Sequence, residues 1–191
     1  MRNLIFLFLL LPIGLLAQRD SVYVKTDIFL VVYSEVLQQP KWVTYTVQCP
    51  NGKTPRTGMD FYTVPDIITS DNADYVDNVY DKGHCAPAAD FNCTKEMLYK
   101  TFSYVNCVLQ NQYLNRGVWR LLEAYERDLA ATTGVTVKIK MVYSNTSVKL
   151  PTGATVPDGF YKIITYNNRV EKYYFPNIKP TSSDFKQYLI K

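Results

Sequence analysis

The sequence predicts a single domain of the α+β class, with a central antiparallel sheet and flanking helices. Segments rich in β-branched and aromatic residues, which are typical of strands, occur towards both ends of the chain. They span residues 28–36, 41–47, 135–143, 160–166 and 170–175. The best helical pattern lies between these two groups, so strands and helices do not alternate. This order favours an α+β fold over repeated βαβ units.

The strongest helix is predicted from Asn115 to Ala131. Apolar residues recur there at intervals of three and four, which places them on one side of a helix. These residues are Val118, Leu122, Tyr125 and Leu129. A shorter helix is expected at 94–102, whereas residues 48–80 are expected to be mostly loop.

The first 17 of the 191 residues are typical of a signal peptide. Arg2 gives a charged start, Leu4–Leu16 is apolar, and Ala17 is a small residue at the expected cleavage point. The apolar run is shorter than the roughly 20 residues that a membrane helix needs. We therefore expect residues 18–191 to form the domain, to be secreted or periplasmic, and to have no membrane contact after cleavage.

Charge and cysteine content set limits without deciding the function. The formal net charge is +4, and it falls to +3 when Arg2 is removed with the signal. This balance is compatible with a polyanionic partner but does not require one. The even cysteine count of an exported chain suggests up to two disulfides, and the sequence leaves the three pairings open. The cysteines are Cys49, Cys85, Cys93 and Cys107. A zinc site is the disfavoured alternative, because CxxC pairs are missing.

The single histidine lies in the segment Asp81-Lys82-Gly83-His84. Most isolated histidines are surface or core residues, but here a glycine permits a tight turn and charges of both signs are adjacent. A neutral imidazole with a pKa near 6.5 can accept a proton from water around neutral pH. His84 is therefore a candidate general base.

Polar side chains share one side of the predicted helix. Asn115, Glu123 and Arg127 span roughly 120° of its surface, at about 100° per residue. Magnesium prefers oxygen ligands and keeps several waters, so one amide oxygen can serve as the direct protein ligand. The helix thus offers a candidate metal site beside a cation.

Three ordered motifs carry a family resemblance. They are DKGHCAPAADF at 81–91, NCVLQNQYLNRGVWRLLE at 106–123 and VPDGFYKII at 156–164. This pattern resembles the non-specific DNA/RNA endonucleases of the ββα-metal (His-Me finger) fold, the group that includes endonuclease G. Their hallmarks are an Asp-Arg-Gly-His segment and a later Asn-x-Gly-x-Trp-x-x-Leu-Glu segment. The likeness runs from about residue 42 to 177, most of the expected domain.

The resemblance implies a secreted endonuclease that cuts DNA and RNA without marked sequence preference. It assigns His84 as the general base and Asn115 as the direct ligand of magnesium, or of manganese in its place. Glu123 would hold a metal-bound water. The metal would act as a Lewis acid on the scissile phosphate.

The remaining roles are electrostatic or supporting. Three cations would stabilise the charge that builds on the phosphate; these are Arg56, Lys82 and Arg127. Three further residues would support the site; these are Asp81, which orients the turn, and Asn106 and Gln110. Lys82 replaces the arginine usual in the family, and Leu109 replaces a proline. Relatives often carry larger apolar residues where this chain has Cys85, Cys93 and Cys107. Either these cysteines pack as small apolar groups or two of them form a disulfide, and we favour the disulfide.

Two other classes of protein remain open. The first is a nucleic-acid-binding protein of the same fold that has lost turnover because of Lys82 and Leu109. The second is an exported, disulfide-linked interaction domain. A homo-oligomer is compatible with any of the three, and the sequence does not indicate a preference between DNA and RNA.

Overall fold

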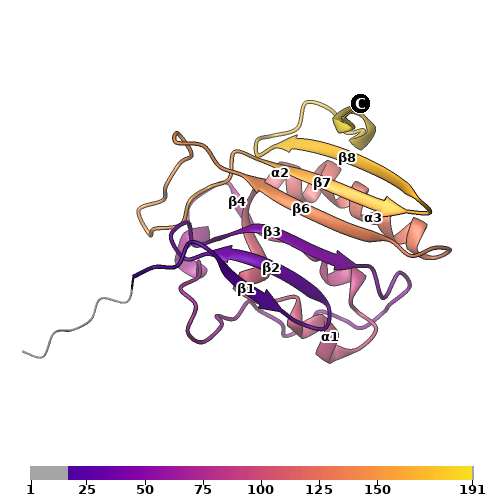
Figure 1. Cartoon of the computed structure of the whole chain (residues 1–191), viewed down its shortest axis with the longest axis horizontal. Helices are drawn as coiled ribbons and strands as arrows, with labels where there is room; N and C mark the ends of the chain where they lie inside the picture. Colours follow the sequence, from indigo (N-terminus) through magenta and orange to yellow (C-terminus); the bar gives the residue numbers. More distant parts are fainter. Residues whose placement is uncertain (1–16, 191) are drawn as a thin grey trace, which may run out of the picture.

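The framework of the molecule is a six-stranded antiparallel sheet, seen face-on in Figure 1. The computed structural model describes residues 17–190, so residues 1–16 of the expected signal peptide lie outside it. The strand order is β1-β2-β3-β6-β7-β8. The strands are β1 (Val22–Lys25), β2 (Phe29–Ser34), β3 (Gln39–Thr46), β6 (Thr136–Val142), β7 (Gly159–Tyr166) and β8 (Arg169–Pro176).

A separate hairpin and most of the helices follow β3 along the chain. The hairpin pairs β4 (Tyr80–His84) with β5 (Cys107–Asn111), antiparallel. The α-helices are α1 (Lys95–Lys100), α2 (Gln112–Leu114) and α3 (Arg120–Ala130). A π-type turn, η4 (Asn115–Trp119), connects α2 to α3. Short 3₁₀ turns lie at η1 (Asn72–Tyr75), η2 (Ala88–Asp90), η3 (Tyr104–Asn106) and η5 (Phe185–Tyr188).

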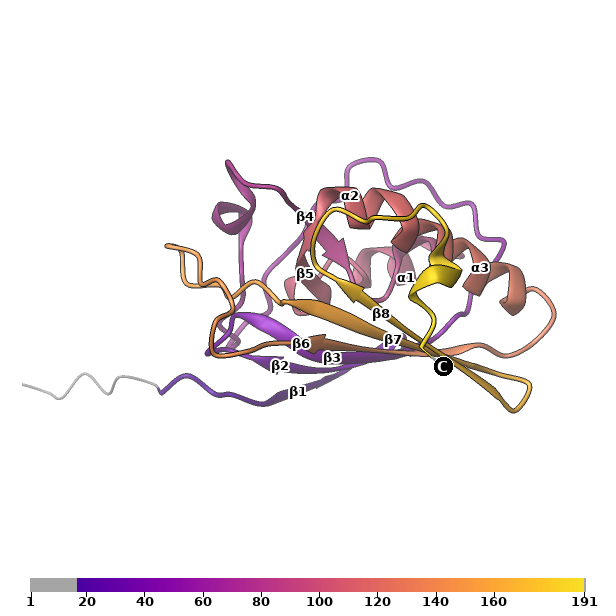
Figure 2. The same cartoon turned by 90° about the horizontal axis from the view of Figure 1, so that it is seen from above.

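The molecule has two layers, which Figure 2 shows edge-on. The hairpin and helices α1 to α3 lie on one face of the six-stranded sheet, and within residues 17–190 no helix covers the other face. None of the helices described here has the length and hydropathy needed to span a bilayer. The core forms between the layers, where Val43, Ile139 and Phe175 of the sheet meet Trp119 and Leu122.

Alternation of side chains gives the sheet its two faces. In β6, Val137, Ile139 and Met141 are buried, whereas Lys138 and Lys140 are exposed. Successive side chains of a strand point to opposite faces, so this period of two buries one face only. The same alternation occurs in β7, which pairs with β6 along its whole length.

Most of the predicted elements are present, three strands were not predicted, and the expected continuous helix is interrupted. The five predicted strands correspond to β2, β3, β6, β7 and β8, and the predicted short helix corresponds to α1. The sequence did not predict β1 or the β4–β5 hairpin. The prediction of a continuous helix from Asn115 is wrong, because η4 is a π-type turn in which Gly117 has non-helical dihedral angles. Regular α-helix begins at Arg120.

The expected disulfide exists, but its pairing differs from the prediction. Cys49 is joined to Cys93, and this bond ties the segment after β3 to the segment before α1. Cys85 and Cys107 are buried free thiols in the apolar interior. The expected bridge between two of Cys85, Cys93 and Cys107 is therefore wrong, because Cys93 pairs with the distant Cys49.

Candidate active site

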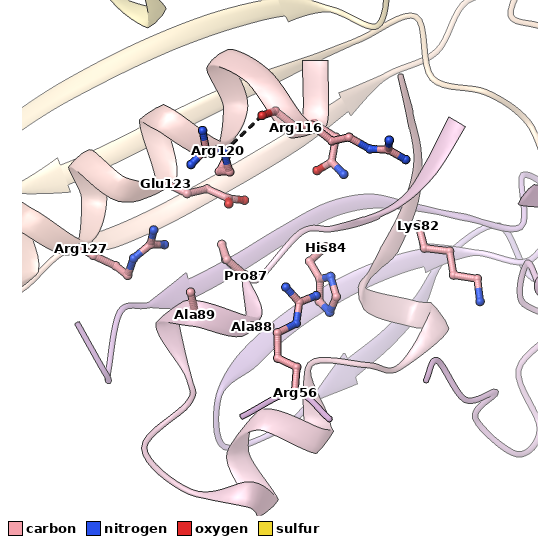
Figure 3. A pocket seen from close by; sticks show the side chains of 11 residues that line it. Arg56, Lys82, His84, Pro87, Ala88, Ala89, Arg116, Arg120, Glu123 and Arg127 are labelled. Atoms are coloured by element: carbon pink, nitrogen blue, oxygen red, sulfur yellow. Dashed lines mark hydrogen bonds between the residues drawn. The ribbon is translucent and has the colours of Figure 1, made fainter. Parts of the chain in front are cut away.

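A cavity of about 420 Å³ lies where the end of β4 faces η4 and α3 (Figure 3). It is lined by Arg56, Lys82, His84, Pro87, Ala88, Ala89, Asn115, Arg116, Arg120, Glu123 and Arg127. The predicted base and the predicted metal ligand, distant in the sequence, thus line one cavity. The three predicted supporting residues lie behind this lining. These are Asp81, Asn106 and Gln110.

His84 is the last residue of β4 and is wedged between aromatic rings. Its ring centroid lies 4.7 Å from that of Phe61 and 4.8 Å from that of Phe102. Its Nε2 atom is buried and has no hydrogen-bond partner among the described residues. Burial, together with the nearby Arg56 guanidinium, lowers the pKa of His84 to about 3. The imidazole is therefore neutral at physiological pH, the form that can accept a proton.

Arg56 approaches the histidine from the long loop between β3 and β4. Figure 3 shows its guanidinium beside the His84 ring. The Arg56 Cζ atom also lies 5.4 Å from the centroid of the Phe102 ring, a cation–π distance. The loop prediction for this segment is confirmed, and the structure adds that Arg56 is held at the cavity by an aromatic contact.

Asn115 is oriented by Asp81. Its Nδ2 donates to Asp81 Oδ2 at 2.9 Å. Arg116 holds the same carboxylate with Nε at 2.9 Å and Nη2 at 2.6 Å. Because the amide nitrogen is used in this way, the amide oxygen of Asn115 is left free to bind a cation. Asp81 was expected to orient the turn before His84, but its contacts are with Asn115 and Arg116.

Glu123 supplies the other oxygen atoms suited to a metal. Its side chain is half-buried at the cavity and belongs to none of the described ion pairs. Burial raises the pKa of Glu123 to about 7, although the Lys162 and Arg127 cations act in the opposite direction. Within residues 17–190 no three His, Cys, Asp or Glu side chains form a metal cluster. The oxygen atoms of Asn115 and Glu123 therefore fit a hard, largely hydrated cation.

Arg127 is fixed by a buried acid. Its Nη1 donates to Asp90 Oδ1 at 3.0 Å, and Asp90 is fully buried at the end of η2. Although Arg127 follows Glu123 by one helical turn, its ion-pair partner comes from a different element. The pair connects α3 to the segment that follows His84.

Lys82 lines the same cavity but its ammonium is engaged at the rim. Nζ donates to Asp60 Oδ1 at 3.1 Å and also to Asn72. It lies 5.6 Å and 5.7 Å from the ring centroids of Phe61 and Tyr104. In Figure 3 the Lys82 side chain points away from the His84 ring. The predicted cation is thus present, but it is held at a distance from the base by its own contacts.

Asn106 and Gln110 belong to the scaffold behind His84. Asn106 is buried and accepts from Ala86 N at 2.8 Å, while its Nδ2 donates to Ala86 O and Thr101 O at 2.9 Å each. These bonds fix the segment that follows the histidine. Gln110 is also buried and packs closely against Gly83 across the hairpin.

Two arginines of the cavity were not predicted. Arg116 and Arg120 line it, and Arg120 Nε donates to Arg116 O at 3.2 Å. The sequence held a signal for them, because 116, 120, 123 and 127 fall at i, i+4, i+7 and i+11, the spacing of one helix face.

The fold and the cavity together define a ββα unit, in which a hairpin presents a histidine to the turn η4, which carries an amide, and to the helix α3, which carries a carboxylate and arginines. The chain belongs to the DNA/RNA non-specific endonuclease family, whose model matches residues 12–189. The predicted family and the ββα-metal fold are confirmed. A solved EndoG/EndoGI complex matches with a TM-score of 0.78 and 24% identity, over 88% of this chain and 80% of that one.

Curated relatives match over shorter segments. "Nuclease EXOG, mitochondrial" of Danio rerio is 32% identical over 51% of this chain and 30% of its own length. "Nuclease" of Nostoc sp. is 29% identical over 61% of this chain and 47% of its own length. The aligned segments thus cover less than half of each of these two relatives.

Proposed function

We propose that this protein is a metal-dependent nuclease that hydrolyses phosphodiester bonds of DNA and RNA without marked sequence preference. The observation that carries the proposal is the meeting of His84 and Asn115 in one arginine-lined cavity. The similarity to a mitochondrial nuclease EXOG and to a cyanobacterial nuclease supports it.

In the proposed mechanism His84 takes the proton of the attacking water. The imidazole is neutral before the substrate binds, because it is buried beside the Arg56 cation. A bound phosphate would neutralise that cation, which makes the imidazole a stronger base when the substrate is in place. Phe61 and Phe102 hold the ring at its position during the transfer.

Arginines would hold the phosphate and the charge that develops on it. Arg56 and Arg120 reach the cavity from opposite sides in Figure 3, and Arg127 is anchored by Asp90. Arginine matches the geometry of phosphate oxygens with paired donors. Contacts to phosphate carry no base information, so this lining favours cleavage without sequence preference.

Asn115 and Glu123 would hold the metal, and Asp81 would keep the Asn115 oxygen turned towards it. Magnesium, or manganese in its place, would supply Lewis-acid stabilisation of the phosphate and the leaving oxygen. This metal choice rests on the donor atoms, which are oxygen only.

We further propose that the protein is exported and degrades nucleic acid outside the cytoplasm. The apolar N-terminal sequence supports export. The Cys49–Cys93 disulfide also fits an oxidising compartment.

Nicking of supercoiled plasmid DNA, with magnesium and with EDTA, tests the proposed activity. We expect metal-dependent nicking, a loss of about 10²- to 10⁴-fold in rate for His84→Ala, and a higher metal requirement for Asn115→Ala. Lys149→Gln, an exposed residue that does not line the cavity, is the control. Absence of metal-dependent nicking at micromolar protein would support a binding protein instead. Nicking by the His84→Ala variant at the rate of the parent would show that the activity does not arise at His84, and would leave the interaction domain open.

A further inference from the structure

The six-stranded sheet has an outward face that none of the described helices covers. Figure 2 shows this face along the lower side of the sheet, opposite the hairpin and α3. Neighbouring strands align their outward side chains in rows. One row runs across Trp42, Lys140, Tyr161 and Tyr174, each paired with the next. With strands about 4.8 Å apart, four adjacent strands give a row roughly 14 Å long.

The charges on this outward face have one sign. The register and burial of the strands place four lysines there, and none of the other outward strand positions within residues 17–190 is acidic. These lysines are Lys25, Lys138, Lys140 and Lys172. Two acids lie at the rim, where Asp20 pairs with Lys41 at 3.1 Å and Asp158 accepts from Ser147 Oγ at 2.9 Å. The outward face therefore attracts polyanions.

Aromatic rings are interleaved with these lysines. Lys138 Nζ lies 4.8 Å from the Trp42 ring centroid, and Lys172 Nζ lies 4.7 Å from that of Tyr161. The rings of Tyr161 and Tyr174 are 4.9 Å apart. A hollow of about 450 Å³, lined by Trp42, Lys140 and Tyr161 and at its edge by the paired Asp20 and Lys41, leaves room for a flat ligand beside the rings.

We propose that the outward face of the sheet binds single-stranded nucleic acid at a distance from the cavity. Its lysines contact successive phosphates, and Trp42, Tyr161 and Tyr174 stack on bases. A sheet that presents two or three aromatic rings beside cations is a general platform for single strands, because every base offers a π-face. The choice of nucleic acid among polyanions rests on the proposed function of the cavity.

Charge argues against a second copy of this chain as the occupant. A twofold contact places the same patch on both subunits, so the lysine-rich face would meet its own like charges. A nucleic acid instead neutralises the lysines and releases its counterions. The same face thus favours a strand of phosphates over self-association.

Tryptophan emission tests the proposal directly, because the chain has only two tryptophans. Trp119 is buried and packs against Phe160 and Phe175, whereas Trp42 is half-exposed on the outward face. We expect a single-stranded thymine 20-mer, added in the presence of EDTA, to quench the emission of Trp42. Fluorescence anisotropy of the labelled 20-mer measures binding in the same titration. The Trp42→Phe variant isolates any response of Trp119. Saturated binding without quenching of Trp42 would overturn the proposal.

Lysine variants provide the second arm. Replacing Lys138, Lys140 and Lys172 by Gln should raise the Kd for the 20-mer at least tenfold and reduce the salt slope by about 2, at roughly 0.7 per contact. The matched control replaces an equal number of exposed lysines elsewhere by Gln; these are Lys95, Lys149 and Lys186. Equal weakening by both sets would show a general charge effect and overturn the proposal.

Two further measurements separate the outward face from the cavity. Metal-dependent cleavage of a dinucleotide should be the same in the lysine variant and the parent. If the 20-mer quenches Trp42 but neither the parent protein nor the lysine variant cleaves the dinucleotide, the proposed nuclease activity is contradicted. Binding of single strands by the outward face would still be supported. In sedimentation of the protein alone, we expect no dimer that depends on Trp42. A dimer that dissociates in the Trp42→Ala variant would identify the face as a subunit interface and overturn the proposal.

Discussion

Asp81 is the residue on which the orientation of the candidate metal ligand depends. Its carboxylate accepts from the Asn115 amide and from two nitrogen atoms of Arg116. A primary amide can present either its oxygen or its nitrogen to a ligand, and only the oxygen binds a cation. By using the nitrogen, Asp81 selects the oxygen-forward orientation of Asn115.

Removal of this acceptor should weaken metal binding without removing a ligand. We expect Asp81→Ala to raise the magnesium concentration for half-maximal nicking by about 10- to 100-fold, the usual cost of losing a partner that orients a ligand. Asp81→Asn retains an acceptor oxygen and is the matched control. We expect it to raise the magnesium concentration for half-maximal nicking by a smaller factor. Equal half-maximal concentrations in Asp81→Ala and the parent would contradict the orienting role.

His84 can be observed alone, because it is the single histidine of the chain. Burial and the Arg56 cation lower its pKa to about 3, so proton NMR of the metal-free protein should show a neutral ring well below pH 6. The unfolded chain takes up this proton at about pH 6.5, and the folded chain does not. Stability that is present above pH 6.5 is therefore lost as the pH falls towards 3.

Arg56→Gln should move the His84 pKa upwards but leave it below its ordinary value, because burial is the larger cause. The same NMR titration measures this shift. Lys82→Gln is the control, since the Lys82 ammonium is held by Asp60 and should affect the ring less. A His84 resonance that titrates near pH 6.5 in the parent protein would contradict the buried position of the ring.

At the scale of elements, the sequence predicted what local patterns determine. The apolar stripe on α3 and the alternation in β6 follow from neighbours a few residues apart, and both are present. The β4 strand, Tyr80–His84, has no apolar alternation and forms through its pairing with the distant β5. Its long-range origin explains why the hairpin that carries His84 was missed, although the motif itself identified the residue.

The same limit applies to side-chain partners in the candidate site. The motifs identified Asn115 and Glu123 through the family resemblance, because both residues lie within one short segment of the sequence. They did not identify the partner of Lys82, which is Asp60, or that of Arg127, which is Asp90. Those contacts join separate elements, so they depend on how the loops pack and not on local spacing.

The β4–β5 hairpin depends on close packing at Gly83. A Cβ atom there would lie 2.6 Å from Gln110 Oε1, 2.7 Å from Gln110 Cβ and 3.2 Å from the Val108 oxygen. We expect Gly83→Ala to lower the free energy of unfolding by about 1–3 kcal/mol, as overpacking does. It should also slow nicking, because His84 is the next residue. Urea unfolding and the plasmid assay measure the two effects.

Gly134→Ala, in the connection between α3 and β6, is the matched control for Gly83→Ala. A Cβ atom there would meet nothing within 4 Å, so the substitution should leave stability unchanged or raise it by about 0.4–1 kcal/mol. Equal destabilisation by the two substitutions would show that loss of glycine itself, and not the contact with Gln110, is the cause.

At the scale of the whole molecule, a buried polar cluster joins the two layers. Lys162 of β7 and Glu126 of α3 form an ion pair at 2.8 Å, and neither side chain is exposed. Tyr45 of β3 donates to the same carboxylate at 2.9 Å, and the Lys162 ammonium lies 4.3 Å from the Trp119 ring centroid. A buried charge without its partner is costly, so this cluster favours one placement of α3 on the sheet. That placement also faces Glu123 and Arg127 towards His84.

The Cys49–Cys93 disulfide closes a long segment of the chain that contains both Arg56 and His84. The bonded residues are 44 positions apart. Closing a loop of this length lowers the conformational entropy of the unfolded chain, which stabilises the folded state by about 4 kcal/mol. We therefore expect reduction to lower the urea midpoint substantially and to weaken nicking, since the Arg56 loop loses its tie to the segment before α1. The Cys49→Ser/Cys93→Ser variant should match the reduced parent in both assays and should not respond to the reductant. Were the reductant to lower the midpoint of that variant as much as that of the parent, the stabilisation would have to arise elsewhere than in this bond.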